Sequence, residues 1–219
     1  MIDQPTLDRV IEFHGHMCAG LAMGVRAAEV ALAEVGAHAA DEEVVAIVET
    51  DMCGVDAVQF LTGCTFGKGN LVHRDFGKNA YTFIRRSDGR AVRISTPAGG
   101  WNSHSLGAEW GDLLSRIRAG TSTPHDRERF AALQADRSEA IMTAPIEALY
   151  DVRPVAVQAP RRARILASVD CARCGEPTME SRLGRLDGML LCPPCFDDAA
   201  AGAVPVPSPV GPRRPPSPA

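Results

Sequence analysis

Four cysteines near the C-terminal end constrain the fold of this chain more than any other feature of its sequence. They form two Cys-x-x-Cys pairs, Cys171/Cys174 and Cys192/Cys195, with 17 residues between the pairs. Four thiolates at this spacing are typical of a tetrahedral structural zinc site. A segment this short cannot bury a sufficient core, so the bound metal has to supply folding free energy. An iron–sulfur cluster or a redox-active cysteine pair is the alternative that the spacing also allows.

The residues between and after the two pairs predict a small fold around this metal. Residues 183–191 can form a hairpin that turns at Asp187 and the glycine after it, because Asp-Gly favours a two-residue turn. Residues 197–201 can start a helix after the second pair. We therefore predict a zinc ribbon or treble clef over residues 168–200. Pro, Val, Ser and Arg then dominate without periodicity, which predicts a disordered tail over residues 201–219.

A second group of metal-ligand side chains lies near the N-terminal end. His14, His16 and Cys18 alternate with other residues between Phe13 and Gly20. In an extended segment all three side chains point to one side, whereas in a helix only His14 and Cys18 share a face. We predict an irregular loop that becomes a helix near Cys18, where the helix dipole favours a thiolate. Two imidazoles and a thiol at this density favour a metal site over a buried structural cysteine.

Cys53 is the candidate fourth ligand of this core site. It follows residues 44–48, a continuous apolar run that predicts a buried strand, and residues just past such a strand often build a site. A straight helix from Cys53 to Cys64 would separate the two thiols by about 16 Å, too far to share a metal. If both belong to one site, Gly63 has to break that helix; otherwise Cys53 lies closer to the metal and Cys64 lines the site.

Cys18, Asp56 and Lys68 are the candidate catalytic residues of the core site. Asp56 or Lys68 could assist proton transfer or hold a substrate anion. Lys68 lies in a glycine-rich turn that lacks the glycine spacing and the Ser/Thr of a Walker A loop, so we reject a phosphate-loop interpretation. The predicted ion is Zn²⁺ or Fe²⁺, and a catalytic site would keep one coordination position open.

The remaining patterns predict a mixture of helices and strands. Glycine and alanine at positions 20, 24, 27 and 31 form a small-residue stripe on one helix, which lets another element approach closely. Alternating apolar residues on both sides of Ser87–Arg90 predict a β-hairpin. Helices are predicted over residues 5–13, 18–35, 55–61, 110–118, 126–140 and 145–150. A core domain over residues 1–150 would thus precede a linker over residues 151–167.

Composition excludes several classes of protein. The chain has 219 residues and a formal net charge of −4, and only Arg173, Arg182 and Arg185 provide positive charge in the zinc segment, which argues against a nucleic-acid partner. We find neither a secretory leader nor an apolar run long enough to span a bilayer, and we expect a cytoplasmic protein that does not contact a membrane. Seven cysteines in a reducing compartment indicate metal sites or catalysis and not disulfides.

Several linked motifs resemble one known family. They are the residues 13–20 (FHGHMCAG), the residues 53–70 (CGVDAVQFLTGCTFGKGN) and the residues 73–78 (HRDFGK). In this order they resemble the FmdE family, which is named for the E subunit of formylmethanofuran dehydrogenase, and the four-cysteine segment resembles the ribbon of its longer members. Ala19 departs from the family pattern, where proline is common, but the change removes no ligand.

The resemblance implies an α+β fold: a thioredoxin-like core with a mixed β-sheet flanked by helices, and a small treble-clef zinc domain. It also implies a metal-capable pocket and a homodimer. The family name does not by itself imply an activity. The first hypothesis is a small metalloenzyme, or an accessory to a metal-dependent oxidoreductase, that acts on a small anionic substrate. The alternative is a metal carrier or an interaction module that docks a protein partner through its zinc ribbon.

Overall fold

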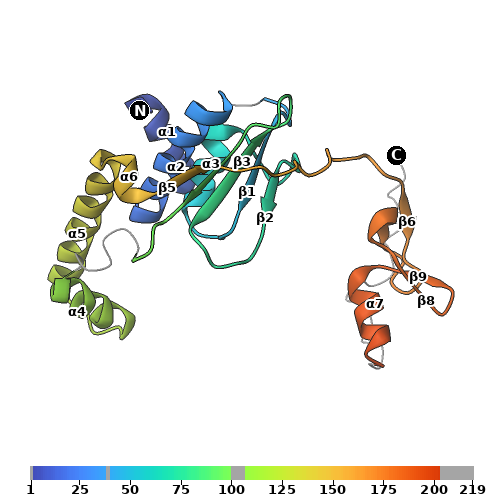
Figure 1. Ribbon diagram of the computed structural model, residues 1–219. Helices are drawn as coiled ribbons and strands as arrows, with labels where there is room; N and C mark the ends of the chain where they lie inside the picture. Colours follow the sequence, from blue (N-terminus) through green and yellow to red (C-terminus); the bar gives the residue numbers. More distant parts are fainter. Residues whose placement is uncertain (1, 38–39, 100–106, 203–219) are drawn as a thin grey trace, which may run out of the picture. The chain divides into compact units, whose positions relative to one another are not determined.

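The computed structural model describes residues 2–37, 40–99 and 107–202 (Figure 1). Two compact units make up the chain, Met1–Ala163 and Arg164–Ala219. All but the first two residues of the predicted disordered tail lie outside the described residues. Within the described part, no helix is long and apolar enough to cross a membrane.

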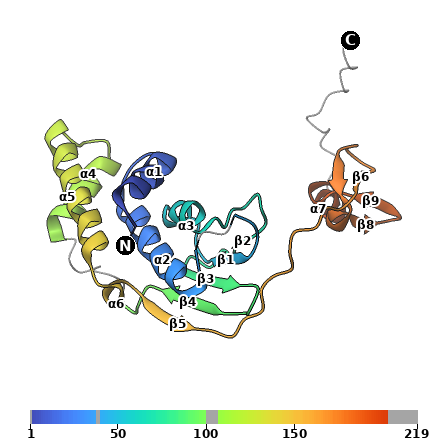
Figure 2. The same cartoon turned by 90° about the horizontal axis from the view of Figure 1, so that it is seen from above.

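Three helices form one layer of the first unit (Figure 2). They are α1 (Gln4–His14), α2 (Ala19–Val35) and α3 (Gly54–Thr62). Asp3 caps α1 by accepting a hydrogen bond from the Thr6 N–H at 2.9 Å, and Gly36 follows the last residue of α2. Gly63 ends α3 in the left-handed conformation that glycine adopts at helix ends. These boundaries lie within one residue of the helices predicted over residues 5–13, 18–35 and 55–61.

A five-stranded mixed sheet lies against these helices, with the strand order β2-β1-β3-β4-β5. Its strands are β1 (Val44–Val48), β2 (Leu71–His73), β3 (Ala80–Arg85), β4 (Ala91–Ser95) and β5 (Asp151–Pro154). β1 and β2 are parallel, and every other neighbouring pair is antiparallel. The β3–β4 hairpin confirms the one predicted from sequence. β2 was not predicted, because three residues are too few to show a periodicity.

Residues 151–163 belong to the first unit, although we predicted a linker there. Residues 151–154 form β5 and pair with β4. Val155 and Ala159 then pack on the face of the sheet that the three helices leave free, against Val45, Ile47 and Ile84. The proline and arginine content suggested a linker, but an edge strand tolerates proline, and the apolar residues still have a buried face to cover.

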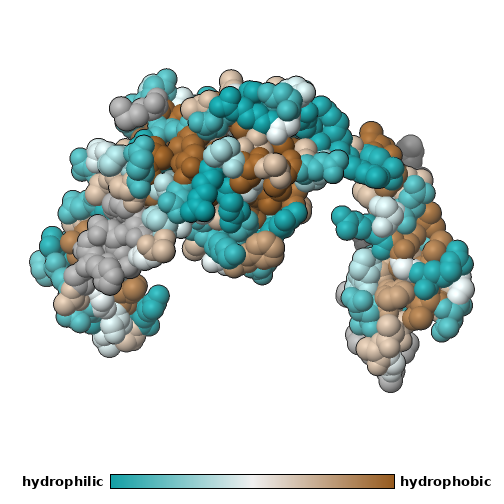
Figure 3. Space-filling view, viewed as in Figure 1, coloured by the Kyte–Doolittle hydropathy of each residue, from teal (hydrophilic) through white to brown (hydrophobic). Residues whose placement is uncertain are grey.

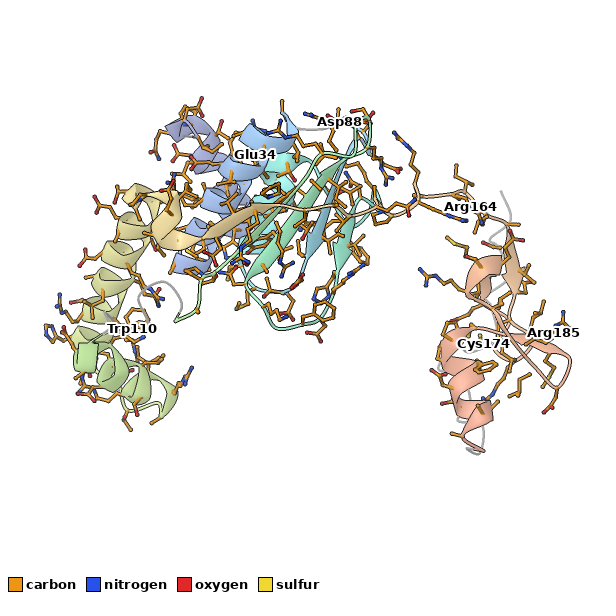
Figure 4. The ribbon with its side chains drawn as sticks, in the orientation of Figure 1. Glu34, Asp88, Trp110, Arg164, Cys174 and Arg185 are labelled. Carbon is orange, nitrogen blue, oxygen red and sulfur yellow. The ribbon has the colours of Figure 1, made fainter. Side chains whose placement is uncertain are left out.

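Helices α4 (Gly107–Arg118), α5 (Pro124–Thr143) and α6 (Ile146–Leu149) connect β4 to β5. A capping box formed by Thr123 and Asp126 starts α5. Trp110 on α4, labelled in Figure 4, contacts the ring of Phe130 on α5 with 4.6 Å between the ring centres. Ile141 at the end of α5 and Tyr150 after α6 are buried in the main core, and the Tyr150 hydroxyl donates to the Met23 carbonyl at 2.8 Å. Ile141 thus attaches α5 to the main core, and Tyr150 attaches the segment after α6 to α2.

The second unit consists of two small hairpins and one helix. Its elements are β6 (Ser168–Asp170), β7 (Pro177–Met179), the 3₁₀ turn η1 (Glu180–Arg182), β8 (Gly184–Leu186), β9 (Met189–Leu191) and α7 (Pro193–Ala200). Asp187 and Gly188 both have positive φ at the β8–β9 turn, as the Asp-Gly pair predicts. Its buried core holds Leu191 and two cysteines, whereas Met179, Met189 and Val169 are exposed, and apolar surface of this unit is brown in Figure 3.

The fold class is therefore α+β, with a mixed sheet, flanking helices and a separate four-cysteine unit. The more specific expectation of a thioredoxin-like core stays a prediction, as does the homodimer.

Candidate metal centre and adjoining pocket

The junction between α1 and α2 brings the first His/Cys group together. Gly15 ends α1 with φ of 95°, a conformation that other residues rarely adopt. Cys18 then caps α2, and its Sγ accepts a hydrogen bond from the Leu21 N–H at 3.3 Å. α1 ends at His14 and α2 begins at Ala19, so a loop of four residues connects the two helices. This is the irregular loop and helix start that the sequence predicts.

His14, His16 and Cys18 each offer one ligand atom within 4.8 Å of the others. The His14 Nε2 and the Cys18 Sγ are 4.0 Å apart, and the two imidazole rings lie with 4.9 Å between their centres. Ligands of one zinc ion are about 2.0–2.3 Å from the metal, so they lie within about 4.6 Å of each other. The three side chains therefore have the donor chemistry and nearly the spacing that a shared divalent ion requires.

Asp56 fixes the orientation of His14. The His14 Nδ1 donates to the Asp56 Oδ2 at 2.7 Å, while Nε2 faces Cys18. His14 is 11% exposed and Asp56 is 39% exposed, so the carboxylate keeps contact with water. A histidine that donates one ring N–H to a carboxylate offers its other nitrogen as a lone pair, which is the arrangement common around metal-bound histidines. Asp56 thus contacts a candidate ligand from the side away from Cys18.

Cys53 lies beside Cys18 but outside the group of three donors. It caps α3 without a side-chain hydrogen bond to the helix. A Cβ placed on Gly20 would be 3.7 Å from the Cys53 Sγ and 3.8 Å from the Cys18 Sγ, so both thiols border this glycine. Partial burial, and then the neighbouring Cys18 thiol, raise the pKa of Cys53. The structure therefore places the predicted fourth ligand next to the group without including it.

A close crossing of α2 and α3 produces this convergence. A Cβ on Gly24 would lie 2.2 Å from the Gly54 carbonyl oxygen, and a Cβ on Gly54 would lie 2.5 Å from the Tyr81 hydroxyl. Only glycine fits at these two positions. The small-residue stripe predicted from the sequence thus lets α3 approach α2, and that approach brings Cys53 to Cys18.

A pocket of about 380 Å³ adjoins the two thiols. Ala19, Gly20 and Gly54, which directly follow Cys18 and Cys53, form part of its wall. The rest of the lining comes from α2, β3, α5 and the segments next to α3, β3 and β4, and it contains the side chains Met23, Met52, Asn79, Tyr81, Thr96, Arg137 and Ile141. Sequence reasoning missed these residues, because no local pattern joins positions on α2, β3 and α5 and the residue after β4. Nothing in the sequence distinguishes Arg137 from the other arginines of α5.

Cys64 lies at the opposite end of α3 from Cys53. It is fully buried, and its thiol donates to the Val44 carbonyl at 3.3 Å, where β1 begins. The nine residues of α3 span about 13 Å at 1.5 Å per residue. Gly63 does break the helix, but the chain then turns toward the start of β1 and not back to Cys53. The structure therefore corrects the expectation that Cys64 lines the core site.

Lys68 lies with Cys64 and not with the His14 group. Burial raises the pKa of Cys64, and the positive charge of Lys68 opposes that rise. Lys68 lines a different groove, together with Gln59 and Thr65. Of the three candidate catalytic residues, the structure brings together Cys18 and Asp56 around His14, and it separates Lys68 from them.

The second unit gathers Cys171, Cys174, Cys192 and Cys195, whose sulfur atoms all lie within 4.8 Å of one another. Cys174, labelled in Figure 4, and Cys192 have their sulfurs 3.8 Å apart, and sulfurs bound tetrahedrally to one zinc are also about 3.8 Å apart. Desolvation opposes ionisation of Cys171, but N–H donors of Cys174, Cys192 and Arg173 outweigh it and lower the pKa to about 6. Desolvation and the other three thiols raise the pKa of Cys195 to about 12.

Two family models match the chain. The model described as "FmdE, Molybdenum formylmethanofuran dehydrogenase operon" matches residues 13–151, and the "Prokaryotic dksA/traR C4-type zinc finger" matches residues 164–199. The second match implies a structural Zn²⁺ at the four cysteines, in agreement with their geometry. The FmdE resemblance inferred from sequence motifs is confirmed.

Similar proteins include one from Archaeoglobus fulgidus, named "Probable S-adenosyl-L-methionine-binding protein", which is 34% identical over 191 residues. That alignment covers 84% of this chain and 50% of the relative, so the chain spans about half the length of this curated protein. A crystal structure of a tungsten formylmethanofuran dehydrogenase FmdE-like protein from Syntrophus aciditrophicus has a TM-score of 0.57, covers 94% of each chain, and is 21% identical. At this identity the likeness concerns the fold alone.

Proposed function

Because this chain belongs to the FmdE family, we propose that its first unit binds one divalent ion, Zn²⁺ or Fe²⁺, through His14, His16 and Cys18. The observation that carries the proposal is the approach of three metal-ligand atoms to within 4.8 Å of one another. Imidazole and thiolate suit both ions, so the donor set does not choose between them. Three protein ligands would leave one tetrahedral position for water or a substrate.

Asp56 supports this role as a positioning residue. By accepting a hydrogen bond from the Nδ1–H, it directs the Nε2 lone pair of His14 toward Cys18. A carboxylate partner also makes the imidazole a stronger ligand. In the proposed centre Asp56 therefore acts through His14 and does not transfer a proton to or from a substrate.

Two versions of the proposed function differ in whether Cys53 coordinates the metal. If its thiol stays outside the coordination sphere, the open position is available to water or a substrate, and the metal can act as a Lewis acid or lower the pKa of bound water. If it becomes a fourth ligand, the site is closed and favours a carrier or accessory protein. Its place beside Cys18 but outside the group of three supports the open version, a small metalloenzyme.

Elemental analysis of the full chain, purified anaerobically without added metal, tests the proposal. We expect two metal ions per chain in the wild type and one in the double variant His16→Ala with Cys18→Ser, since the four-cysteine site stays intact. Cys64→Ser is the matched control, because it removes a buried thiol that lies outside both groups. Unchanged metal content in the double variant would refute the core site.

The coordination shell can be read with Co²⁺ in place of the native ion. Charge-transfer bands report thiolate ligands, so Cys53→Ser should leave the core-site spectrum unchanged if Cys53 is not a ligand. A loss of about one thiolate's absorbance would instead favour the closed carrier site.

The name of the Archaeoglobus relative makes S-adenosylmethionine a second ligand to test. Because the alignment covers only half of that protein, the name alone does not place its binding residues in the half that matches this chain. Equilibrium dialysis of the wild type with radiolabelled S-adenosylmethionine decides the matter directly, and retention that survives the His16→Ala, Cys18→Ser variant would place this binding outside the metal centre.

A further inference from the structure

The lining of the pocket beside Cys18 and Cys53 includes Tyr81 and Arg137, besides the neutral polar residues Asn79 and Thr96, and the proposed metal centre uses none of them. Tyr81 reaches it from β3 and Arg137 reaches it from α5. Neither is a ligand or a partner of His14. Their surroundings indicate what the pocket could hold.

Tyr81 is 1% exposed and lines the pocket, and its hydroxyl makes no hydrogen bond to another residue in the described part of the chain. The hydroxyl lies against Gly54, where a Cβ would come within 2.5 Å of it. Burial, and to a lesser extent Cys53, raise the pKa of Tyr81, so the group stays protonated and can donate. Because the hydroxyl borders the pocket and has no hydrogen-bond partner among the described residues, it can donate a hydrogen bond to a molecule bound there.

Arg137 is a half-buried cation at the same pocket. Its guanidinium lies over the ring of Trp110, 5.6 Å from the ring centre. Among residues 2–37, 40–99 and 107–202, no carboxylate lies within ion-pair distance of it. Burial lowers the pKa of Arg137, but an arginine remains charged in proteins. A partly desolvated guanidinium with no counter-charge favours an anion, above all a planar one that accepts two parallel hydrogen bonds.

Most of the remaining lining is apolar, and Asn79 and Thr96 add two neutral polar side chains. Met23, Met52 and Ile141 surround the space, together with Ala19 and the two glycines. A volume of about 380 Å³ is at the small end of ligand pockets, which usually range over about 300–1,000 Å³. The occupant is therefore a small organic molecule with one anionic end and a short apolar part.

We propose that this pocket binds a small aliphatic carboxylate, with its charged end held by Arg137 and Tyr81 and its apolar chain against Met23 and Ile141. The sequence suggested Lys68 as the residue that holds a substrate anion, and Arg137 takes that role here. Binding of the carboxylate depends only on the pocket. Gly20 lines the pocket and also lies beside both thiols, so a bound molecule would be close to the proposed metal centre. The further statement that this molecule is a substrate rests on that metal centre.

Isothermal titration of the full chain with hexanoate tests the proposal, with hexanamide as the neutral analogue of equal shape and with inorganic phosphate as an anion without an apolar part. We expect hexanoate to bind at least 10-fold more tightly than either. Arg137→Gln should weaken hexanoate at least 10-fold and should remove the preference over hexanamide. Tyr81→Phe should weaken it about 10- to 100-fold, as expected for the loss of one hydrogen bond to a charged group.

The control Arg118→Gln removes an exposed arginine of α4 and should leave hexanoate binding unchanged. Thermal unfolding of each variant checks folding; Tyr81→Phe should melt with the wild type, since its hydroxyl has no described partner. Absence of hexanoate binding at 10 mM, equal binding of hexanamide, or unchanged binding in both Arg137→Gln and Tyr81→Phe would each overturn the proposal.

Metal analysis of the same samples keeps the two proposals apart. Arg137→Gln and Tyr81→Phe should retain two metal ions per chain, because neither residue contacts a donor atom of the core group. Conversely, the His16→Ala, Cys18→Ser variant should still bind hexanoate. If this double variant retains two metal ions per chain, the proposed metal centre is refuted, whatever the titrations with hexanoate show.

Discussion

The two cysteine groups of this protein are built in opposite ways. The C-terminal group takes four identical ligands from 25 consecutive residues, Cys171 to Cys195, and gathers all four sulfurs within 4.8 Å. The N-terminal group combines two histidines with Cys18, and its neighbour Cys53 comes from another helix. One group is complete in itself, whereas the other has three donors, an oriented histidine and a pocket at its side.

The difference shows what each metal would do. Four thiolates fill a tetrahedral shell, so the zinc of the second unit has no position for a reactant and serves to fold a segment with a very small buried core. The first unit has a large core without any metal, which includes Leu21, Phe83 and Ile94. Its donors are not needed for folding and are free to serve binding or chemistry.

The largest expected effect is the loss of the second unit when its metal is removed. Cys174→Ser with Cys192→Ser should abolish hydrogen-exchange protection in residues 168–200 and leave the protection of β1, β3 and α2 intact. Structural zinc contributes about 10–16 kcal/mol to such folding at neutral pH. Retained protection in residues 168–200 would show that this unit folds without metal and would break the comparison.

The next largest effect is expected from a substitution at the crossing of α2 and α3. The core group depends on this crossing, and the four-cysteine group does not. Gly24→Ala should destabilise the first unit by about 3 kcal/mol in urea unfolding, because its Cβ would overlap the Gly54 carbonyl. It should also weaken core metal binding while the four-cysteine zinc is retained. Gly111→Ala on α4 is the control, where no atom lies within 4 Å of the new Cβ, and it should stabilise by about 0.5–1 kcal/mol. Equal stabilities would contradict the close crossing.

A smaller effect is expected when His14 loses the carboxylate that orients it. Asp56→Asn should lower core metal affinity about 10- to 100-fold, as loss of a carboxylate behind a metal-bound histidine does, without changing the zinc of the second unit. Competition with a fluorescent chelator measures this affinity. Asp51→Asn removes the same charge from an exposed position and should have no effect. If both variants weaken the site equally, the effect is one of overall charge and not of His14 orientation.

The smallest expected effect concerns pH and the metal-free stability of the first unit. Glu49 at the end of β1 pairs with Arg93 of β4 through two hydrogen bonds, one of 2.9 Å, and the Arg93 guanidinium lowers the pKa of Glu49. A lowered pKa adds stability above the unfolded-state value of about 4.3, and that stability is lost as the pH falls through the folded-state value.

Glu49→Gln should therefore destabilise the chelator-treated protein by about 1–2 kcal/mol at pH 7, as expected for hydrogen bonds to a charged group. The difference between the variant and the wild type should shrink as the pH falls below about 4.3. Urea unfolding at pH 7 and pH 3, followed by tryptophan fluorescence, gives both values. A difference that does not depend on pH would mean that Glu49 acts through packing and not through its charge.

Much of the local structure follows from single residues of the sequence. Asp3, Gly36 and Gly63 delimit helices where capping preferences predict, and the apolar run of residues 44–48 forms the predicted buried strand. β2 and β5 were missed or taken for linker, because an edge strand of three or four residues is defined by its partner and not by its own pattern.

By itself the sequence determined the elements that depend on neighbouring residues: the four-cysteine group, the His14–Cys18 turn, and the glycines that cap α1 and α3. Their spacing along the chain is short enough that local geometry brings the side chains together. The tertiary structure alone decided that Cys53 meets Cys18 while Cys64 does not, that Asp56 faces His14, and that Tyr81 and Arg137 share a pocket. These contacts join distant parts of the chain, and they arise from the packing of α2 against α3, the sheet and α5, which no local pattern encodes.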